Sequence, residues 1–150
     1  MDGMEERIAG KTKHGEITID QLAQIQPGMA RLMDEISRRF SYLYYAAKGG
    51  NWPMAKHQYN ETISIMNIAK VTRPKYIQDI EAFEKHHLSP ILDAIEHKDW
   101  KEFGPAYKRA VEASDFYHDK YNYSYIRFVI PSKPPEHMDF GPPEKFSRKK

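Results

Sequence analysis

The chain has 150 residues, ten of them tyrosine and none cysteine, and a net charge of +2. This length suggests a single domain with one modest core. The absence of cysteine excludes disulfides, Fe–S clusters, zinc-thiolate sites and covalently attached haem. Acidic and basic residues are interspersed, and no apolar run approaches the ~20 residues that span a bilayer. The composition therefore predicts a soluble, cytoplasmic protein that binds neither nucleic acid nor a membrane.

Residues 1–27 form a polar N-terminal segment without the apolar stretch of a secretory signal. His14 and Gly15 predict the turn of a short β-hairpin, because Ile17 and Ile19 alternate with polar residues after it. Two strands alone are marginal in water. We therefore expect this hairpin to pack against another part of the protein or against a partner.

Residues 28–74 predict two amphipathic helices joined by a short break. Gly49 and Gly50 end the first helix, and Asn51 caps the second. A linker this short makes the two helices antiparallel. The second helix should end near Thr72, because a proline follows Arg73. Apolar residues recur at helical spacing along both stretches, namely Leu32, Ile36, Phe40, Leu43, Ala47, Ala55, Tyr59, Ile63 and Met66.

Residues 75–122 predict the remaining helices. A helical stripe ends near Leu88, and Ser89-Pro90 starts a new turn of helix. Asp99 and Glu102 have the spacing of a reciprocal capping box before the last long helix. The expected fold class is all-α: residues 28–122 form an antiparallel four-helix bundle, preceded by the short N-terminal β-hairpin.

Residues 123–150 predict an extended, proline-rich C-terminal arm. Its apolar residues are widely spaced, so the arm has no core of its own. We expect it to lie over a partner protein. The residues expected to make this contact are Pro131, Pro134, Pro135, Met138, Phe140 and Phe146.

Two groups of aromatic and polar residues are candidates for a substrate pocket or an interface. Tyr44, Tyr45 and Trp52 lie near the Gly-Gly-Asn break. Tyrosine combines an apolar ring with a polar hydroxyl and therefore suits a surface that is partly exposed to solvent. Arg73 and Tyr76 lie at a helix break, a place that carries function more often than a helix middle. The last candidate is His118, which sits among tyrosines on the last helix.

A metal site built from helical histidines is a further hypothesis. Glu84-x-x-His87 has the spacing of bundle di-metal sites, and Asp115-x-x-His118 is a loose second copy. An independent metalloenzyme would also draw on Glu35, His57 and Glu61, but the spacing gives only one true pair. Ordinary surface or hydrogen-bonded side chains explain these residues more simply, so we expect this chain to bind no metal.

The stretches GGNWPMAKHQYNE, RPKY and ILDAIEHKDWKEFGPAY resemble a four-helix family related to bacterial c-type cytochromes. Many members carry a CxxCH haem motif in the last helix, and the matching place here is residues 114–118. The histidine of the motif is present as His118, but both cysteines are absent. This resemblance implies a haem-less bundle that holds a small aromatic ligand, or haem bound non-covalently with His118 as its axial ligand.

A closer resemblance covers nearly the whole chain. QIQPGMARLM, YYAAKGGN, VTRPKY, DWKEF, FYHDKYNYSYIRFVIPSKPP and MDF resemble the family of small (alpha) subunits of hydroquinone 1,2-dioxygenases. In that family the small subunit pairs with a larger beta subunit, which binds the catalytic Fe(II), in an α2β2 heterotetramer. The enzyme opens the hydroquinone ring to give 4-hydroxymuconic semialdehyde. The resemblance implies that this chain is the non-iron subunit, that Fe(II) is held by the partner subunit, and that the chain itself binds no cofactor.

Overall fold

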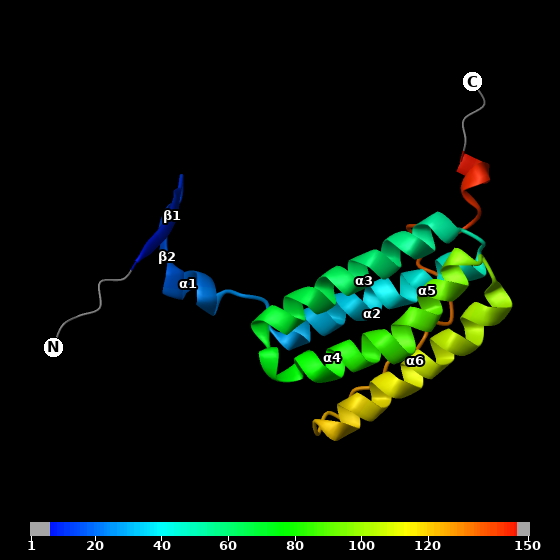
Figure 1. Cartoon of the computed structure of the whole chain (residues 1–150). Helices are drawn as coiled ribbons and strands as arrows, with labels where there is room; N and C mark the ends of the chain where they lie inside the picture. The colour runs from blue at the N-terminus through cyan, green and yellow to red at the C-terminus, as the bar shows by residue number, and fades with distance from the viewer. Residues whose placement is uncertain (1–6, 147–150) are drawn as a thin grey trace.

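The computed structural model describes residues 7–146, which are mostly helical with one two-stranded sheet near the N-terminus. Helices α2 to α6 lie side by side and form what we call the helical body (Figure 1). Among the described residues, no helix is both long and apolar enough to cross a membrane. The outer ends of the predicted segments 1–27 and 123–150 lie outside the described residues.

The N-terminal elements form a unit that stands apart from the helical body (Figure 1). Strands β1 (Ile8–Thr12) and β2 (Gly15–Thr18) pair antiparallel, as predicted, and lead into helix α1 (Ile19–Gln24). The N-cap of α1 is a capping box in which Oγ1 of Thr18 accepts from the backbone N–H of Gln21 at 3.1 Å. Helix α1 has no buried residue. Four large apolar side chains of this N-terminal unit are between 44% and 65% exposed, namely Ile8, Ile19, Leu22 and Ile25.

The predicted helical hairpin is confirmed as α2 (Met29–Lys48) and α3 (Trp52–Thr72). Gly50 adopts a φ of 76°, a left-handed conformation that suits glycine. Oδ1 of Asn51 accepts from the backbone N–H of Met54 at 3.1 Å, so Asn51 caps α3 as expected. The end of α3 at Thr72 also matches the sequence.

A continuous helical rod follows, and its middle turn was not predicted from the sequence. After a short turn, η1 (Pro74–Tyr76), the rod runs through α4 (Ile77–Phe83), η2 (Glu84–Leu88) and α5 (Ser89–Glu96), so α5 begins at Ser89 as predicted but without a break in the rod. The turn η2 is π-helical. Pro90 has no backbone N–H, and in a regular helix its ring would clash with the carbonyl of the residue four positions earlier. The wider π-helical turn directly before α5 relieves this conflict, so the rod continues.

Helix α6 (Trp100–Lys120) completes the helical body. Oδ1 of Asp99 accepts from the backbone N–H of Lys101 at 2.9 Å, which confirms Asp99 as the N-cap. The reciprocal half of the predicted capping box is not formed. The carboxylate of Glu102 instead binds Nδ1 of His97 at 2.9 Å, because His97 lies close to the turn before α6.

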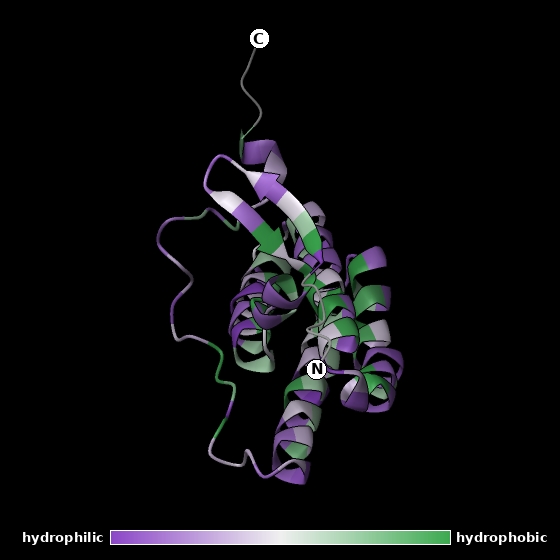
Figure 2. Cartoon of the chain, turned by 90° about the vertical axis from the view of Figure 1, so that its left-hand side faces the viewer, coloured by the Kyte–Doolittle hydropathy of each residue, from purple (hydrophilic) through white to green (hydrophobic). Residues whose placement is uncertain are grey.

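The C-terminal segment, residues 121–142, runs back along the helical body as an extended trace and ends in the short turn η3 (Pro143–Phe146) (Figures 1 and 2). Phe140 is only 7% exposed and lies against the rings of Tyr42 and Tyr45. The hydroxyl of Tyr45 also donates to the carbonyl of Pro131. The sequence predicted Phe140 as an anchor on a partner, whereas the structure places it on α2 of the same chain. Phe146, by contrast, is 47% exposed.

The docking of this segment requires glycine at position 49. A Cβ built on Gly49 would lie 2.1 Å from the carbonyl oxygen of Phe140, which is too close for any side chain. We predict that Gly49→Ala releases the segment and lowers the free energy of unfolding by about 1–3 kcal/mol. Urea unfolding measures the loss, and limited proteolysis detects the freed segment.

Gly104→Ala is the matched control, because a Cβ there meets nothing within 4 Å inside helix α6. This control should gain about 0.5–1 kcal/mol from the better helix propensity of alanine. Equal stability of the two variants would contradict the packing described here.

Candidate ligand cavity

The structure divides the six predicted site residues between the two ends of the helical body. Tyr44, Tyr45 and Trp52 lie at the end where α2 turns into α3. Tyr45 is 7% exposed, and the ring of Tyr44 lies 5.2 Å from the ring of Tyr107 and 5.6 Å from that of Trp100. Aromatic rings therefore pack against one another at this end.

Arg73 and Tyr76 lie at the opposite end, with different surroundings. The guanidinium of Arg73 donates to the carbonyl of Thr72 at 2.7 Å and lies beside Gly28, just before α2. The ring of Tyr76 instead lies 4.8 Å from that of Tyr121, edge to face. Tyr76 thereby joins a group of side chains that surrounds a hollow, and His118 belongs to the same group.

The hollow is a cavity of about 520 Å³ between α2, α3, the rod, α6 and the C-terminal segment. Its wall is mainly apolar and rich in methionine, a side chain that adapts to irregular shapes. Apolar residues of the wall include Met29, Met33, Met66, Ile36, Phe83 and Val111. Most small-molecule sites are concave, mostly apolar spaces of 300–1,000 Å³, so the cavity has the size and character of a ligand site.

His118 is the polar side chain of this wall that lacks a partner. Its Nδ1 is buried and has no hydrogen-bond partner within the protein. A buried polar atom without a partner costs free energy, so each such atom in a native structure calls for an explanation. Nδ1 is closed off from solvent, so it does not face the open space of the cavity.

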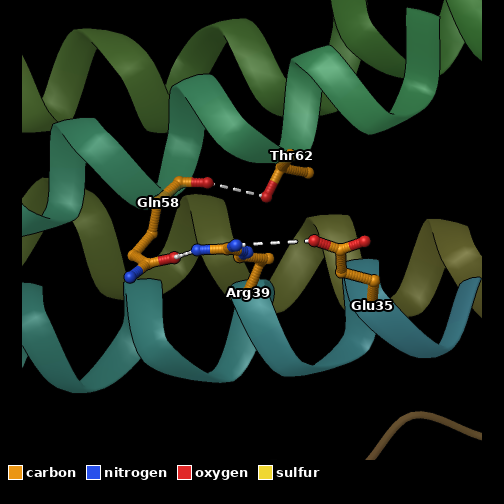
Figure 3. A network of polar contacts seen from close by, with 4 residues as sticks. All are labelled: Glu35, Arg39, Gln58 and Thr62. Carbon is orange, nitrogen blue, oxygen red and sulfur yellow. Dashed lines mark hydrogen bonds and ion pairs between the residues drawn. The ribbon is translucent and has the colours of Figure 1, made fainter. Parts of the chain in front are cut away.

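Oδ1 of Asp115, one turn before His118 on α6, is likewise buried without a partner, whereas polar side chains between α2 and α3 are satisfied, as Figure 3 shows. Oγ1 of Thr62, which also lines the cavity, donates to the carbonyl of Gln58 at 2.8 Å. Oε1 of Gln58 accepts from Arg39 at 3.2 Å, and Arg39 pairs with Glu35 on the same helix. These hydrogen bonds join α2 to α3 beside the cavity.

A charged group lies among the residues that line the cavity beside Tyr76. The carboxylate of Asp79 accepts from the Tyr121 hydroxyl and pairs with Nζ of Lys120 at 2.9 Å. The hydrogen bond from Tyr121, and then that from Lys120, lowers the pKa of Asp79. The same bond to Asp79 raises the pKa of Tyr121. These groups tie α4 to the end of α6.

The candidate metal ligands do not converge. Glu84 binds Nζ of Lys70 at 3.0 Å, whereas the ring of His87 packs against that of Phe83 at 5.6 Å. Burial, together with the charges of His86 and Arg109, lowers the pKa of His87. Within residues 7–146, no three or more His, Asp or Glu side chains are grouped so that they could hold a metal ion.

Sequence reasoning named two residues of the cavity wall, Tyr76 and His118, but missed the cavity itself. Met29 and Met33 repeat at i, i+4, which is a signal for a buried helix face and not for a hollow. Asp79 and Tyr121 are 42 residues apart, so no local pattern links them.

The chain was compared with known proteins in three ways. No protein-family model matches it, and neither does any curated protein or solved structure.

We predict that the contact between Asp79 and Tyr121 makes the protein sensitive to acid. Because the pKa of Asp79 is lower in the folded state, its stabilising effect is complete above its unfolded pKa of about 4 and is lost as the pH falls below that. Tyr121→Phe removes the main cause of the shift. The urea midpoint of this variant should therefore fall less steeply between pH 5 and pH 3 than that of the wild type.

Tyr125→Phe serves as the control for this comparison, because Tyr125 is 78% exposed. Its midpoint should follow that of the wild type at every pH. Parallel curves for Tyr121→Phe and the wild type would refute the role given to Tyr121.

Proposed function

We propose that this chain is the small, non-iron subunit of a two-subunit, Fe(II)-dependent dioxygenase that opens the ring of hydroquinone-type aromatics. The reaction consumes O2 and gives 4-hydroxymuconic semialdehyde. In this proposal the larger beta subunit holds the Fe(II), the two chains form an α2β2 heterotetramer in the cytoplasm, and the present chain stabilises the iron-bearing subunit and helps to shape its substrate pocket. The sequence resemblance supports the choice of reaction, and the structure supports the accessory role.

The observation that carries the accessory role is the N-terminal unit. A two-stranded hairpin is marginally stable in water unless it packs on something. Here it is joined to a helix without a buried residue and stands away from the helical body (Figure 1). Several of its apolar side chains are exposed to solvent. Side chains such as Leu22 and Ile25 would be covered by a partner subunit.

The arrangement of the rest of the chain is compatible with such a subunit. We infer that α2, α3, the rod and α6 form the antiparallel four-helix bundle expected from the sequence, and that the C-terminal segment is its proline-rich arm. The inner side of the arm is anchored on the bundle by Phe140. Its outer side carries Tyr125 and Val129, which are 78% and 76% exposed, so the arm could still contact the larger subunit.

Two places on the bundle could meet the partner's pocket. One is the turn end, where Tyr44 and Trp52 keep part of their surface in solvent. The other is the opposite end, where Arg73, Tyr76 and His118 lie. In either place the aromatic side chains of this chain would exclude water from the substrate, while the metal chemistry belongs to the partner subunit.

The test is co-expression with the iron-bearing large subunit of a hydroquinone dioxygenase. We expect the two chains to elute together and to consume hydroquinone in the presence of Fe(II), because burial of the N-terminal unit stabilises the complex. Leu22→Lys/Ile25→Lys should prevent the joint elution and the activity. A small chain that elutes alone, with or without the large subunit, would refute the proposal.

Ile68→Lys/Val71→Lys is the matched control for this test. Its two residues have the same i, i+3 spacing near the end of α3, and they are 43% and 80% exposed. It adds the same charge to the helical body, and we expect it to leave the complex intact. Loss of the complex in both double variants would mean that added charge alone causes the effect.

The alternative is a stand-alone, haem-less relative of the cytochrome-like family that binds haem non-covalently through His118. The place of His118 in the wall of the cavity favours it. However, the residues that line the cavity include Asp34 and Asp79 but neither Lys nor Arg, so haem propionates would meet no cation there. We therefore expect haem titration of the chain to give no Soret band that depends on His118. A band that disappears in His118→Ala would favour the alternative.

A further inference from the structure

We propose that the cavity binds a neutral, mainly apolar molecule of about three fused aromatic rings, and that this ligand is recognised by its shape and apolar surface without a hydrogen bond to the buried part of the wall. The inference concerns this chain alone. It does not depend on the proposed partner subunit, because the residues that carry it lie in the helical body and the C-terminal segment.

The floor of the cavity, which we define as its buried lining residues, is apolar except for one hydroxyl. That hydroxyl belongs to Thr62 and donates to the carbonyl of Gln58 at 2.8 Å within α3. A polar ligand group on this floor would lose its hydrogen bonds to water and find no free donor in exchange. The floor therefore favours an apolar ligand. Its apolar residues are Ile36, Phe40, Met66, Leu88 and Ala110.

The middle of the wall leaves apolar surface in contact with water when the cavity is empty. Met29 and Met33 of α2, Phe83 of the rod and Val111 of α6 all line the hollow and are only half-buried. A ligand that covers these side chains is stabilised in proportion to the apolar area removed from water. The two methionines are flexible, so they adapt to its outline.

The rings of the wall favour a ligand that is itself aromatic. Tyr76, Phe83, Tyr117 and Phe128 line the cavity from four different parts of the chain. Phe83 and Tyr117 meet edge to face, with ring centroids 6.1 Å apart. A further aromatic ring among them gains edge-to-face or stacked contacts beyond the area it buries, and methionine sulfur is also attracted to ring edges. A saturated molecule of the same size would lack these contacts.

The volume of the cavity suits a small molecule better than a protein helix. A dry apolar cavity of about 150 Å³ is enough for benzene, so about 520 Å³ has room for about three fused rings. Two turns of an α-helix, about 11 Å long and 10 Å wide, would fill roughly 850 Å³. A helix of another protein is therefore too large for this space.

The charges around the cavity favour a neutral ligand. The lining residues include Asp34 and Asp79 but neither Lys nor Arg, so an anion would lose its hydration and meet only negative charge. A cation would also lose hydration. Asp79 is already paired with Lys120 at 2.9 Å, and Asp34 is exposed to solvent, where it attracts a cation only weakly.

The rim of the cavity, which we define as its exposed lining residues, gives the ligand access. Because these residues are in contact with solvent, a ligand can enter without displacing the C-terminal segment. One end of the ligand stays near water there, so a small neutral substituent at that end is tolerated. The residues of the rim are Ala30, Asp34, Ser37, Tyr123 and Ile126.

Fluorescence titration of the purified full-length chain with 1-aminoanthracene tests the proposal. This dye has three fused rings and an amine that is neutral at pH 7, and its emission changes when it leaves water for apolar surroundings. We expect saturable binding of one dye per chain, and displacement of the dye by naphthalene. Anthracene-2-carboxylate has the same rings and a negative charge, and it should bind roughly tenfold more weakly because nothing in the wall compensates that charge.

Val111→Phe fills the cavity from α6 and should weaken the dye roughly tenfold. Val71→Phe is the matched control, because Val71 is 80% exposed on α3 and does not line the cavity. It should leave the affinity unchanged. Circular dichroism checks the folding of both variants. A folded Val111→Phe that binds the dye as tightly as the wild type would refute the site.

A second pair of variants tests the charge argument on the surface, where the fold is not at risk. Ser37→Lys adds a cation to the rim and should strengthen the binding of anthracene-2-carboxylate about threefold, with little effect on the neutral dye. Ser64→Lys adds the same charge at an exposed serine of α3 outside the cavity and should change neither affinity. Equal effects of the two variants would mean that the ligand binds elsewhere.

Equal affinities of the dye and the carboxylate for the wild type would overturn the proposal. So would displacement of the dye by hydroquinone as readily as by naphthalene, because the ligand would then be smaller and more polar than inferred. Failure of these tests leaves joint elution with the larger subunit unaffected, so the two proposals can fail separately.

Discussion

A buried hydroxyl joins the first and the last helix of the helical body. Tyr107 of α6 is 1% exposed, stacks on Phe40 of α2 with ring centroids 4.3 Å apart, and donates its hydroxyl to the carbonyl of Phe40 at 2.8 Å. Burial raises the pKa of Tyr107 far above its usual value, so the hydroxyl keeps its proton and stays a donor. Phe40 also lines the cavity and meets Phe128 of the C-terminal segment edge to face. The contact of α2 with α6 therefore positions both the cavity wall and the segment that covers it.

The aromatic side chains serve two purposes at the two ends of the body. At the turn end the rings fill the interior themselves: Trp100 stacks on Phe103, which in turn stacks on Tyr107. At the other end the rings of Tyr76 and Tyr121 meet edge to face beside an unfilled space. Aromatic side chains thus fill the core at one end of the body and line the cavity at the other, where space between the helices is left unfilled.

Local rules in the sequence predicted the parts of the fold that are decided locally. The helical spacing of α2 and α3, the cap at Asn51 and the end at Thr72 all follow from neighbouring residues. Two features were not predicted, because in each of them two local signals compete. They are the π-helical turn before Pro90 and the contact of Glu102 with His97. For the cavity, the sequence indicated His118 and Tyr76 as candidates, but the hollow between them arises from helices that meet only in the folded chain.

The path of the C-terminal segment also fixes the order in which the cavity is completed. The carbonyl of Pro131 meets the hydroxyl of Tyr45 across 86 residues of sequence, and Tyr123 to Phe128 follow every helix of the body along the chain. During synthesis from the N-terminus, helices α2 to α6 therefore leave the ribosome before the segment that closes the cavity. The methionine-rich wall of the cavity is thus synthesised before the segment that covers one side of it.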